Sequence, residues 1–149
     1  MSEPNAVRKP KGALRARSSP RCFVCGAANP RGLHIQFQAD GADAVSAQWT
    51  PSPEWEGFQG IVHGGVVGTV LDEAMSKAVM GAHYEALTAE LRVRYRKPVG
   101  CGRPLTVRGW VREKNKRRIA TEATLVGSDG AELAHAWAAF LELRGDGKE

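Results

Sequence analysis

Apolar and polar residues alternate in short runs along most of the chain, and turn-forming residues separate these runs. This is the pattern of β-strands with one buried face. Two runs, 33–38 and 44–50, flank the turn signal Asp40-Gly41 and predict a hairpin at the start of the domain. Further strands are expected at 91–96, 105–112, 118–126 and 131–143, with turn residues in the separators 113–116 and 128–130. The pattern therefore predicts an antiparallel sheet.

One helix is expected between these two groups of strands, from Gly64 to about Gly81. Its apolar residues recur every three or four positions, and they are Val66, Val67, Val70, Leu71, Ala74, Met75, Ala78 and Val79. Another face of the helix is small or polar and holds one carboxylate; it consists of Gly65, Gly68, Thr69, Asp72 and Ser76. Because both faces are poor in charge, the helix must be covered. One long central helix wrapped by five or six antiparallel strands is an α+β fold.

The length of 149 residues is sufficient for one compact domain and excludes a two-domain enzyme. The formal net charge of +5 arises within residues 1–21, which hold six basic side chains and one acidic one. The other 128 residues carry 15 charges of each sign, so the domain is not expected to bind nucleic acid. We expect a basic, disordered tail at 1–21, a folded domain at 22–143 and a flexible C-terminus at 144–149.

The basic N-terminus lacks the apolar segment of a secretory signal. Its arginines also fit a mitochondrial presequence, but Pro4, Pro10 and Pro20 would interrupt the amphipathic helix that such a sequence needs. A cytoplasmic protein is therefore the preferred interpretation, with the mitochondrial matrix as the alternative. The longest run without charged residues, 57–71, is shorter than the roughly 20 residues of a membrane span, so no transmembrane segment is expected.

Three cysteines are too few for a disulfide framework and indicate a reducing compartment. Cys22 and Cys25 have the spacing of half a zinc site, but no second such pair exists in the sequence. Cys101 and His34 would complete a site only if the fold happened to bring them there. A redox motif would need a following helix, and the turn at 29–32 is unfavourable for one. We expect a packed local turn and no metal.

The sequence His63-Gly64-Gly65 stands at the start of the expected helix. The first backbone N–H groups of a helix lack partners and lie at the positive end of its dipole, so they can bind an oxygen that carries developing negative charge. Glycines let a substrate approach the backbone closely. A thioester or ester carbonyl bound here would be polarised as in an oxyanion hole.

Asp72 follows Gly65 by seven residues, close to two helical turns, and therefore lies on the same face about 10 Å away. It cannot contact a carbonyl held by Gly65 of its own chain. If Asp72 acts on that carbonyl, two helices must run antiparallel about a twofold axis, which predicts a dimer with two shared sites. The alternative is that Asp72 belongs to a hydrogen-bonded network in the core. Glu73 points about 100° away and is the weaker candidate.

An ordered set of short motifs resembles the hotdog-fold acyl-CoA thioesterases. The motifs are Cys22-Phe-Val-Cys-Gly, Asn29-Pro-Arg-Gly-Leu33, Gly60-Ile-Val-His-Gly-Gly65, Leu71-Asp-Glu73, Thr88-Ala89 and Tyr95-Arg-Lys-Pro98. The similarity is greatest to the 4-hydroxybenzoyl-CoA and phenylacetate-pathway types with a His-Gly-Gly helix start, in the branch that begins with Cys-Phe-Val-Cys-Gly. It spans about residues 22–143.

The resemblance implies a role for each matching residue. Asp72 would be the general base or the nucleophile, Thr88 would hold the attacking water, and Gly65 would donate the oxyanion-hole N–H. His63 would orient the thioester, with Gly64 and Gln59 beside the substrate; some relatives have an Asn where this chain has Gly57. The phosphates of coenzyme A would meet basic side chains among Arg92, Arg94, Arg96, Lys97, Lys114, Lys116, Arg117 and Arg118.

The resemblance also implies a homodimer or homotetramer and no cofactor other than the coenzyme A of the substrate. Two alternatives stay open at this stage. One is an acyl-CoA hydratase or dehydratase on the same fold, in which His63 would serve as the acid or base. The other is an acyl-CoA-binding protein without catalytic activity. The sequence does not identify the acyl group.

Overall fold

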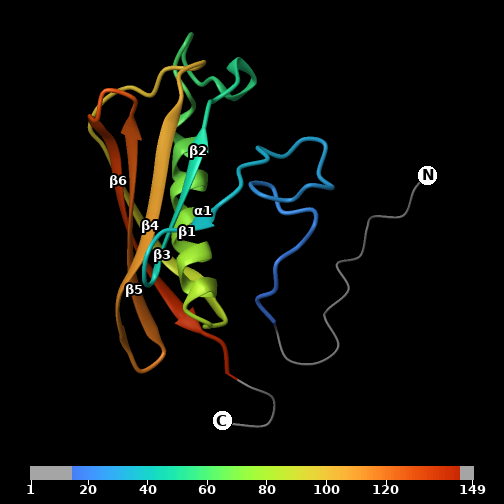
Figure 1. Cartoon of the computed structure of the whole chain (residues 1–149), viewed down its shortest axis with the longest axis vertical. Helices are drawn as coiled ribbons and strands as arrows, with labels where there is room; N and C mark the ends of the chain where they lie inside the picture. Colours follow the sequence, from blue (N-terminus) through green and yellow to red (C-terminus); the bar gives the residue numbers. More distant parts are fainter. Residues whose placement is uncertain (1–14, 145–149) are drawn as a thin grey trace, which may run out of the picture.

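The computed structural model describes residues 15–144 and consists of one long helix packed against a six-stranded antiparallel sheet (Figure 1). The helix α1 spans Gly64–Gly81, as expected from the apolar periodicity. The strands are β1 (Gln38–Ala39), β2 (Ala44–Trp49), β3 (Ala86–Tyr95), β4 (Leu105–Asn115), β5 (Arg118–Gly127) and β6 (Glu132–Glu142), and a short 3-10 helix covers Pro53–Trp55. The sheet order is β1-β2-β4-β5-β6-β3. The expected α+β arrangement is confirmed.

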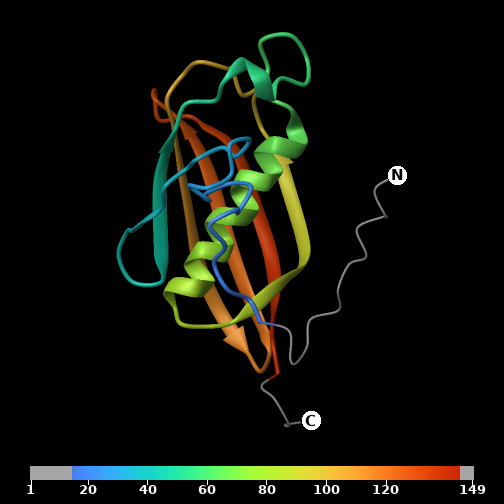
Figure 2. The same ribbon diagram turned by 90° about the vertical axis from the view of Figure 1, so that its right-hand side faces the viewer.

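The core lies between α1 and the concave face of the sheet, which curves around the helix (Figure 2). The largest fully buried side chains include Leu71 and Met75 of α1 together with Ile119, Leu125 and Phe140 of the sheet. Burying such side chains contributes about 1.5–3 kcal/mol each, which is why the apolar face of α1 determines where the helix lies.

Gly109 of β4 marks the closest approach of the sheet to the helix. A Cβ atom at this position would lie 2.5 Å from the backbone C and O atoms of Ala74. We expect Gly109→Ala to lower the free energy of unfolding by about 1–3 kcal/mol, because two rigid backbones must move apart. Denaturant unfolding measures the loss. Gly81→Ala is the control, since no atom lies within 4 Å of its added Cβ, and an equal loss in both variants would contradict the explanation.

The first expected strand is largely wrong. Residues 33–37 form no regular element and lie outside the sheet, and only Gln38–Ala39 pair with β2. The N–H groups of Leu33 and Ile35 instead donate to the carbonyls of Phe23 and Val24. His34, expected within a strand, has a positive φ of 55°. Ile35 is buried, as the alternation predicted. Its backbone N–H, however, donates to Val24 in the turn at 22–26, which we call the cysteine turn, and not to a neighbouring strand.

Two of the later strands, β3 and β4, are longer than their patterns predicted. β3 begins at Ala86, and β4 continues to Asn115, so most of the expected turn at 113–116 is strand. Lys116 adopts a positive φ of 56°, which allows a tight turn between Asn115 and Arg118. The charged residues at 113–114 therefore belong to the solvent-exposed end of strand β4 and not to a loop.

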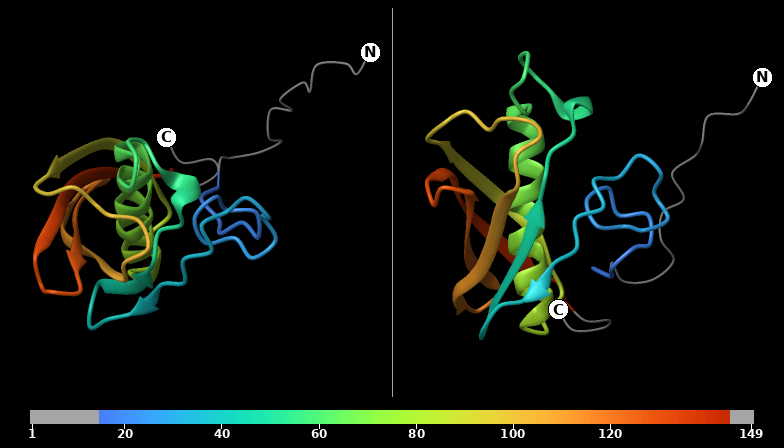
Figure 3. Two further views of the ribbon diagram at one scale, coloured as in Figure 1. Left: turned by 90° about the horizontal axis from the view of Figure 1, so that it is seen from above. Right: turned by 45° about the horizontal axis from the view of Figure 1, so that its top comes forward.

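Residues 15–35 lie along α1 on the side opposite the sheet (Figure 3). Arg15 forms an ion pair with Glu85 at 2.6 Å, and Lys77 donates to Ser18 Oγ at 3.2 Å. Residues 1–14 of the expected tail and residues 145–149 lie outside the described part of the chain. Within residues 15–144, α1 is not apolar enough over its length to be a candidate for crossing a bilayer.

Candidate functional site

The start of α1 is held by the side chain of His63. His63 is the N-cap residue, and its Nδ1 accepts a hydrogen bond from the Gly65 N–H at 2.9 Å. The N–H groups of Val66 and Val67 donate to the His63 carbonyl. Within residues 15–144 no group accepts from the Gly64 N–H. The N–H of Gly65, the expected oxyanion-hole donor, is thus already bonded to the His63 side chain. The N–H that is available at the helix start is that of Gly64.

Tyr95 of β3 covers the same first turn of the helix. Its hydroxyl donates to the Gly64 carbonyl at 2.5 Å, and burial of that hydroxyl raises its pKa. A Cβ on Gly64 or Gly68 would lie 3.5 Å or 3.7 Å from the Tyr95 oxygen, so these small residues let β3 pack close to α1. Tyr95 was visible in the sequence as part of a motif, but nothing there indicated that it contacts the helix start.

Asp72 and Thr88 form the central pair of the site. The Thr88 hydroxyl donates to Asp72 Oδ1 at 2.8 Å, across the gap between α1 and β3. Burial raises the pKa of Asp72, the hydrogen bond from Thr88 lowers it, and the nearby charge of Glu73 raises it; the net shift is upward. A carboxyl with a raised pKa beside a hydroxyl, on an otherwise small helix face, is suited to proton transfer or to nucleophilic attack.

A β-bulge turns Thr88 toward the helix. Along β3 the register passes from Thr88 to Glu90 while β6 advances by a single residue, from Phe140 to Ala139, so Ala89 is the additional residue. In a regular strand, Thr88 would share the outer face of the sheet with Glu90 and Arg92. The bulge reverses this alternation and brings the hydroxyl to Asp72.

The remaining residues expected near the thioester lie around the helix start. Gln59 is exposed near the tip of a loop whose two ends are joined by a bridge between Glu56 and Val62. Gly57 faces His63, because its Cβ would lie 3.0 Å from the His63 Cα. Asp72 is about 10 Å along the helix from Gly65, so the helix start and the Asp72 carboxyl of one chain do not meet.

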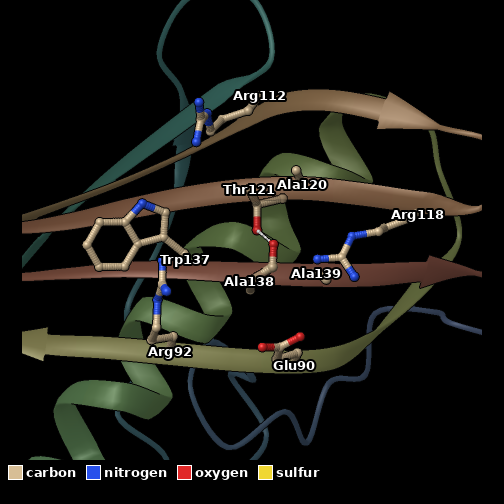
Figure 4. Close-up of a pocket in the computed structure, with 9 residues that line it drawn as sticks. All are labelled: Glu90, Arg92, Arg112, Arg118, Ala120, Thr121, Trp137, Ala138 and Ala139. Atoms are coloured by element: carbon tan, nitrogen blue, oxygen red, sulfur yellow. Dashed lines mark hydrogen bonds between the residues drawn. The ribbon is translucent and has the colours of Figure 1, made fainter.

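The basic candidates lie apart from Asp72, on the outer face of the sheet or at the end of the β4–β5 hairpin. Figure 4 shows Arg92 beside the ring of Trp137 in a hollow that also contains Glu90, Arg112 and Arg118, with α1 on the far side of the sheet. The hollow has a volume of about 230 Å³, and the Arg92 guanidinium carbon lies 4.7 Å from the Trp137 ring centre. Arg112 was missed by the sequence analysis.

The other basic candidates have separate environments. Arg94 is exposed on β3, opposite His135 of β6. Lys116 lies in the β4–β5 turn, and the neighbouring Arg117 donates through Nε to the carbonyl of Glu142 at 3.0 Å. The structure therefore does not gather these side chains at one point.

The cysteine pair forms a packed turn against the helix. Cys22 Sγ donates to Glu73 Oε1 at 3.5 Å, and both cysteines are partly buried. Burial, together with hydrogen bonds to Glu73 and Cys22, raises the pKa of Cys25 to about 11. A thiol with this pKa is a poor nucleophile at neutral pH, which is unfavourable for thiol catalysis. Glu73 is turned toward this pair and away from Thr88.

Comparisons with protein families and solved structures place this chain among known proteins. Residues 59–134 match the family described as the thioesterase superfamily. A crystal structure of a thioesterase superfamily protein has a TM-score of 0.79 and 25% identity over 82% of this chain, which spans only 60% of that protein. The PaaI protein of the Escherichia coli phenylacetic acid degradation operon has a TM-score of 0.69 and 17% identity, over 73% of this chain and 83% of its own.

A third similar structure is a hypothetical thioesterase from Streptococcus pneumoniae crystallised with coenzyme A. Its TM-score is 0.69 at 15% identity, over 75% of this chain and 87% of its own. No curated protein matches the sequence significantly. With the central helix, the antiparallel sheet and these matches together, the chain belongs to the thioesterase superfamily and has the hotdog fold.

Proposed function

We propose that the protein is an acyl-CoA thioesterase, which hydrolyses an acyl-CoA to the free acid and coenzyme A. The observation that carries the proposal is the Asp72–Thr88 hydrogen bond on the small-residue face of α1. A protein that only binds acyl-CoA has no need for a partly buried carboxyl at this place, since burying it is costly. Membership of the thioesterase superfamily supports the same reaction class.

The active site would be shared between two subunits. β3 is an edge strand of ten residues, and its exposed apolar side chains are Leu87 at 42%, Leu91 at 40% and Tyr95 at 52%. Among residues 15–144 no strand pairs with the outer edge of β3, and a long edge with unpaired backbone groups favours pairing with another strand. Antiparallel pairing of two β3 strands about a twofold axis would turn the helices toward each other, so that Asp72 of one subunit approaches the helix start of the other.

The proposed mechanism uses the helix start of one subunit and the Asp72 carboxyl of the other. The N–H of Gly64, joined by that of Gly65 when the His63 ring swings away, would hold the thioester oxygen and stabilise the charge that develops on it. Asp72 of the other subunit would remove a proton from an attacking water, or attack the carbonyl itself, while the Thr88 hydroxyl positions the carboxyl. The C–S bond then breaks, and coenzyme A leaves as its thiolate.

Relatives add two points of support. The Streptococcus pneumoniae thioesterase contains coenzyme A in one crystal. The same protein has been crystallised with an Asp changed to Ala and, separately, with a Thr changed to Ala sixteen residues further along. Asp72 and Thr88 are separated by the same sixteen residues.

Thiol release tests the reaction directly. The protein is incubated with aryl-, short-, medium- and long-chain acyl-CoAs, and free coenzyme A is measured with a thiol-reactive dye. A thioesterase releases one thiol for each acid that forms, and the acyl chain turned over fastest identifies the substrate class. A hydratase would change the absorbance of an enoyl-CoA and leave the thioester intact, and a binding protein would do neither.

Thr88→Ala should move the pH profile in a defined direction. The Thr88 hydrogen bond stabilises the ionised form of Asp72, so its removal raises the pKa of that carboxyl further. The acid limb of kcat/KM should therefore shift to higher pH, and Thr88→Ser should restore it. The measurement is thiol release as a function of pH. An unmoved acid limb in Thr88→Ala would mean that Asp72 does not titrate in the reaction.

A further inference from the structure

A second group of reactive side chains lies on the side of α1 opposite the sheet. The two thiol sulfurs of Cys22 and Cys25 and a carboxylate oxygen of Glu73 all lie within 4.8 Å of one another. The Cys22 sulfur is 3.5 Å from Glu73 Oε1. All three side chains are partly buried, so they are sheltered but reachable from solvent. The proposed thioesterase reaction uses none of them.

Rigid backbone positions these three ligand atoms. The Gly26 N–H donates to the Cys22 carbonyl at 2.9 Å, and the carbonyls of Phe23 and Val24 accept from residues 33 and 35. Val24 is 3% exposed and anchors the turn in the core. A Cβ on Gly26 would lie 2.3 Å from the Cys22 nitrogen, so this position of the turn has room only for a glycine. Glu73 projects from the middle of α1, and the ligand atoms therefore need little rearrangement.

The distances and charges fit a tetrahedral divalent ion. Zn–S bonds of about 2.3 Å and Zn–O bonds of about 2.1 Å place ligand atoms roughly 3.6–3.8 Å apart. The distance of 3.5 Å between the Cys22 sulfur and Glu73 Oε1 is close to this value, and all three ligand atoms lie within 4.8 Å of one another. Two thiolates and one carboxylate carry three negative charges. A divalent cation and the ammonium group of Lys77, which lies 3.8 Å from Glu73 Oε1, balance them. Thiolate ligands select zinc over magnesium or calcium.

We propose that Cys22, Cys25 and Glu73 bind one Zn²⁺ ion, with water as the fourth ligand. The ion replaces the protons of the two thiols and links the turn at 22–26 to α1. Its role is structural: it fastens the N-terminal segment to the helix at the residue next to Asp72. The sequence offered only half of this site, because the third ligand is 48 residues beyond the second cysteine.

Cobalt is the most direct probe. The full-length protein is reduced, freed of metal with a chelator and titrated with Co²⁺. Thiolate coordination produces a sulfur-to-cobalt charge-transfer band and strong visible bands of tetrahedral Co²⁺, which should saturate at one ion per chain and disappear when Zn²⁺ is added. Cys22→Ser and Cys25→Ser should abolish the charge-transfer band or weaken it severely. Cys101→Ser is the matched control and should retain it.

Two further measurements keep the test independent of folding defects in the cysteine variants. Glu73→Gln leaves the turn intact and should weaken Zn²⁺ binding by at least about tenfold. Zinc at about one hundred times its Kd should raise the Tm of the unmodified protein by about 5–10 °C, and the same zinc concentration should produce about half this shift in Glu73→Gln.

Three results would overturn the proposal. One is the absence of a thiolate band in protein whose thiols are shown to be reduced. Another is a band that survives in Cys22→Ser, and the third is a band that is lost in Cys101→Ser. None of these outcomes depends on thioester hydrolysis, so the metal site and the proposed reaction can fail separately.

Discussion

Replacing Asp72 by Asn should lower thiol release from the best acyl-CoA substrate by at least about a hundredfold, the lower range for loss of a general base. The amide has nearly the same shape as the carboxyl, and it can still accept the hydrogen bond from Thr88. It cannot take a proton from water or form an acyl bond. The change should therefore reduce kcat and kcat/KM together, with little effect on substrate binding.

The matched control is Asp43→Asn, which makes the same chemical change at an exposed carboxyl outside the site. Asp43 has a positive φ of 57°, a conformation that Asn also tolerates, so this variant should fold normally and keep full activity. Circular dichroism confirms folding of both proteins. Equal turnover by the Asp72 variant and the unmodified protein would remove Asp72 from the reaction and favour the hydratase or the binding protein.

Charges on the β3 edge should separate the subunits. In the double variant Leu87→Glu and Leu91→Glu, the new carboxylates of the two β3 strands would lie near each other across the paired edges, and their mutual repulsion would oppose the pairing. We expect a monomer, and we expect turnover to fall by about a hundredfold or more because each chain then lacks one half of the site.

Size-exclusion chromatography with light scattering measures the mass, and thiol release on the same fractions measures activity. Met80→Glu is the control, because Met80 is an exposed apolar residue at the end of α1 and not on β3. A monomeric double variant with full activity would show that one chain contains a complete site. A variant that stays dimeric would place the interface elsewhere.

The helix and its chemistry were the most predictable parts of the protein. Apolar spacing placed α1 at Gly64–Gly81, and its small face singled out Asp72. Both features depend on local periodicity, which a sequence displays directly. The family resemblance singled out Thr88 as the residue that holds the attacking water, but neither the resemblance nor the physical pattern predicted its hydrogen bond to Asp72.

Contacts that depend on the fold were not predictable. The Ala89 bulge reverses the face of Thr88, and no residue near it is a turn or bulge signal. Residues 33–37 alternate like a strand, yet their hydrogen bonds go to the cysteine turn. The N–H of Gly65 donates to His63 Nδ1, which a glycine motif cannot reveal. Glu73 meets Cys22 across 51 positions of sequence, a separation that local patterns do not reach.

The proposal of a site shared between two subunits is tested most directly by mixing two variants that are each expected to be inactive. One chain carries Asp72→Ala, and the other carries Gly65→Val, whose side chain crowds His63 and closes the approach to the helix start. The two chains are produced together with different affinity tags, and the dimers that carry both tags are isolated. Thiol release is then compared with that of each variant alone and of the unmodified protein.

In a shared site, the mixed dimer combines the intact Asp72 of one chain with the intact Gly65 of the other, so it should recover about half the activity of the unmodified dimer. The unsorted equimolar mixture should recover about one quarter, because about half of its dimers are mixed. Mixed dimers that stay as inactive as either variant alone would contradict a site assembled from two subunits.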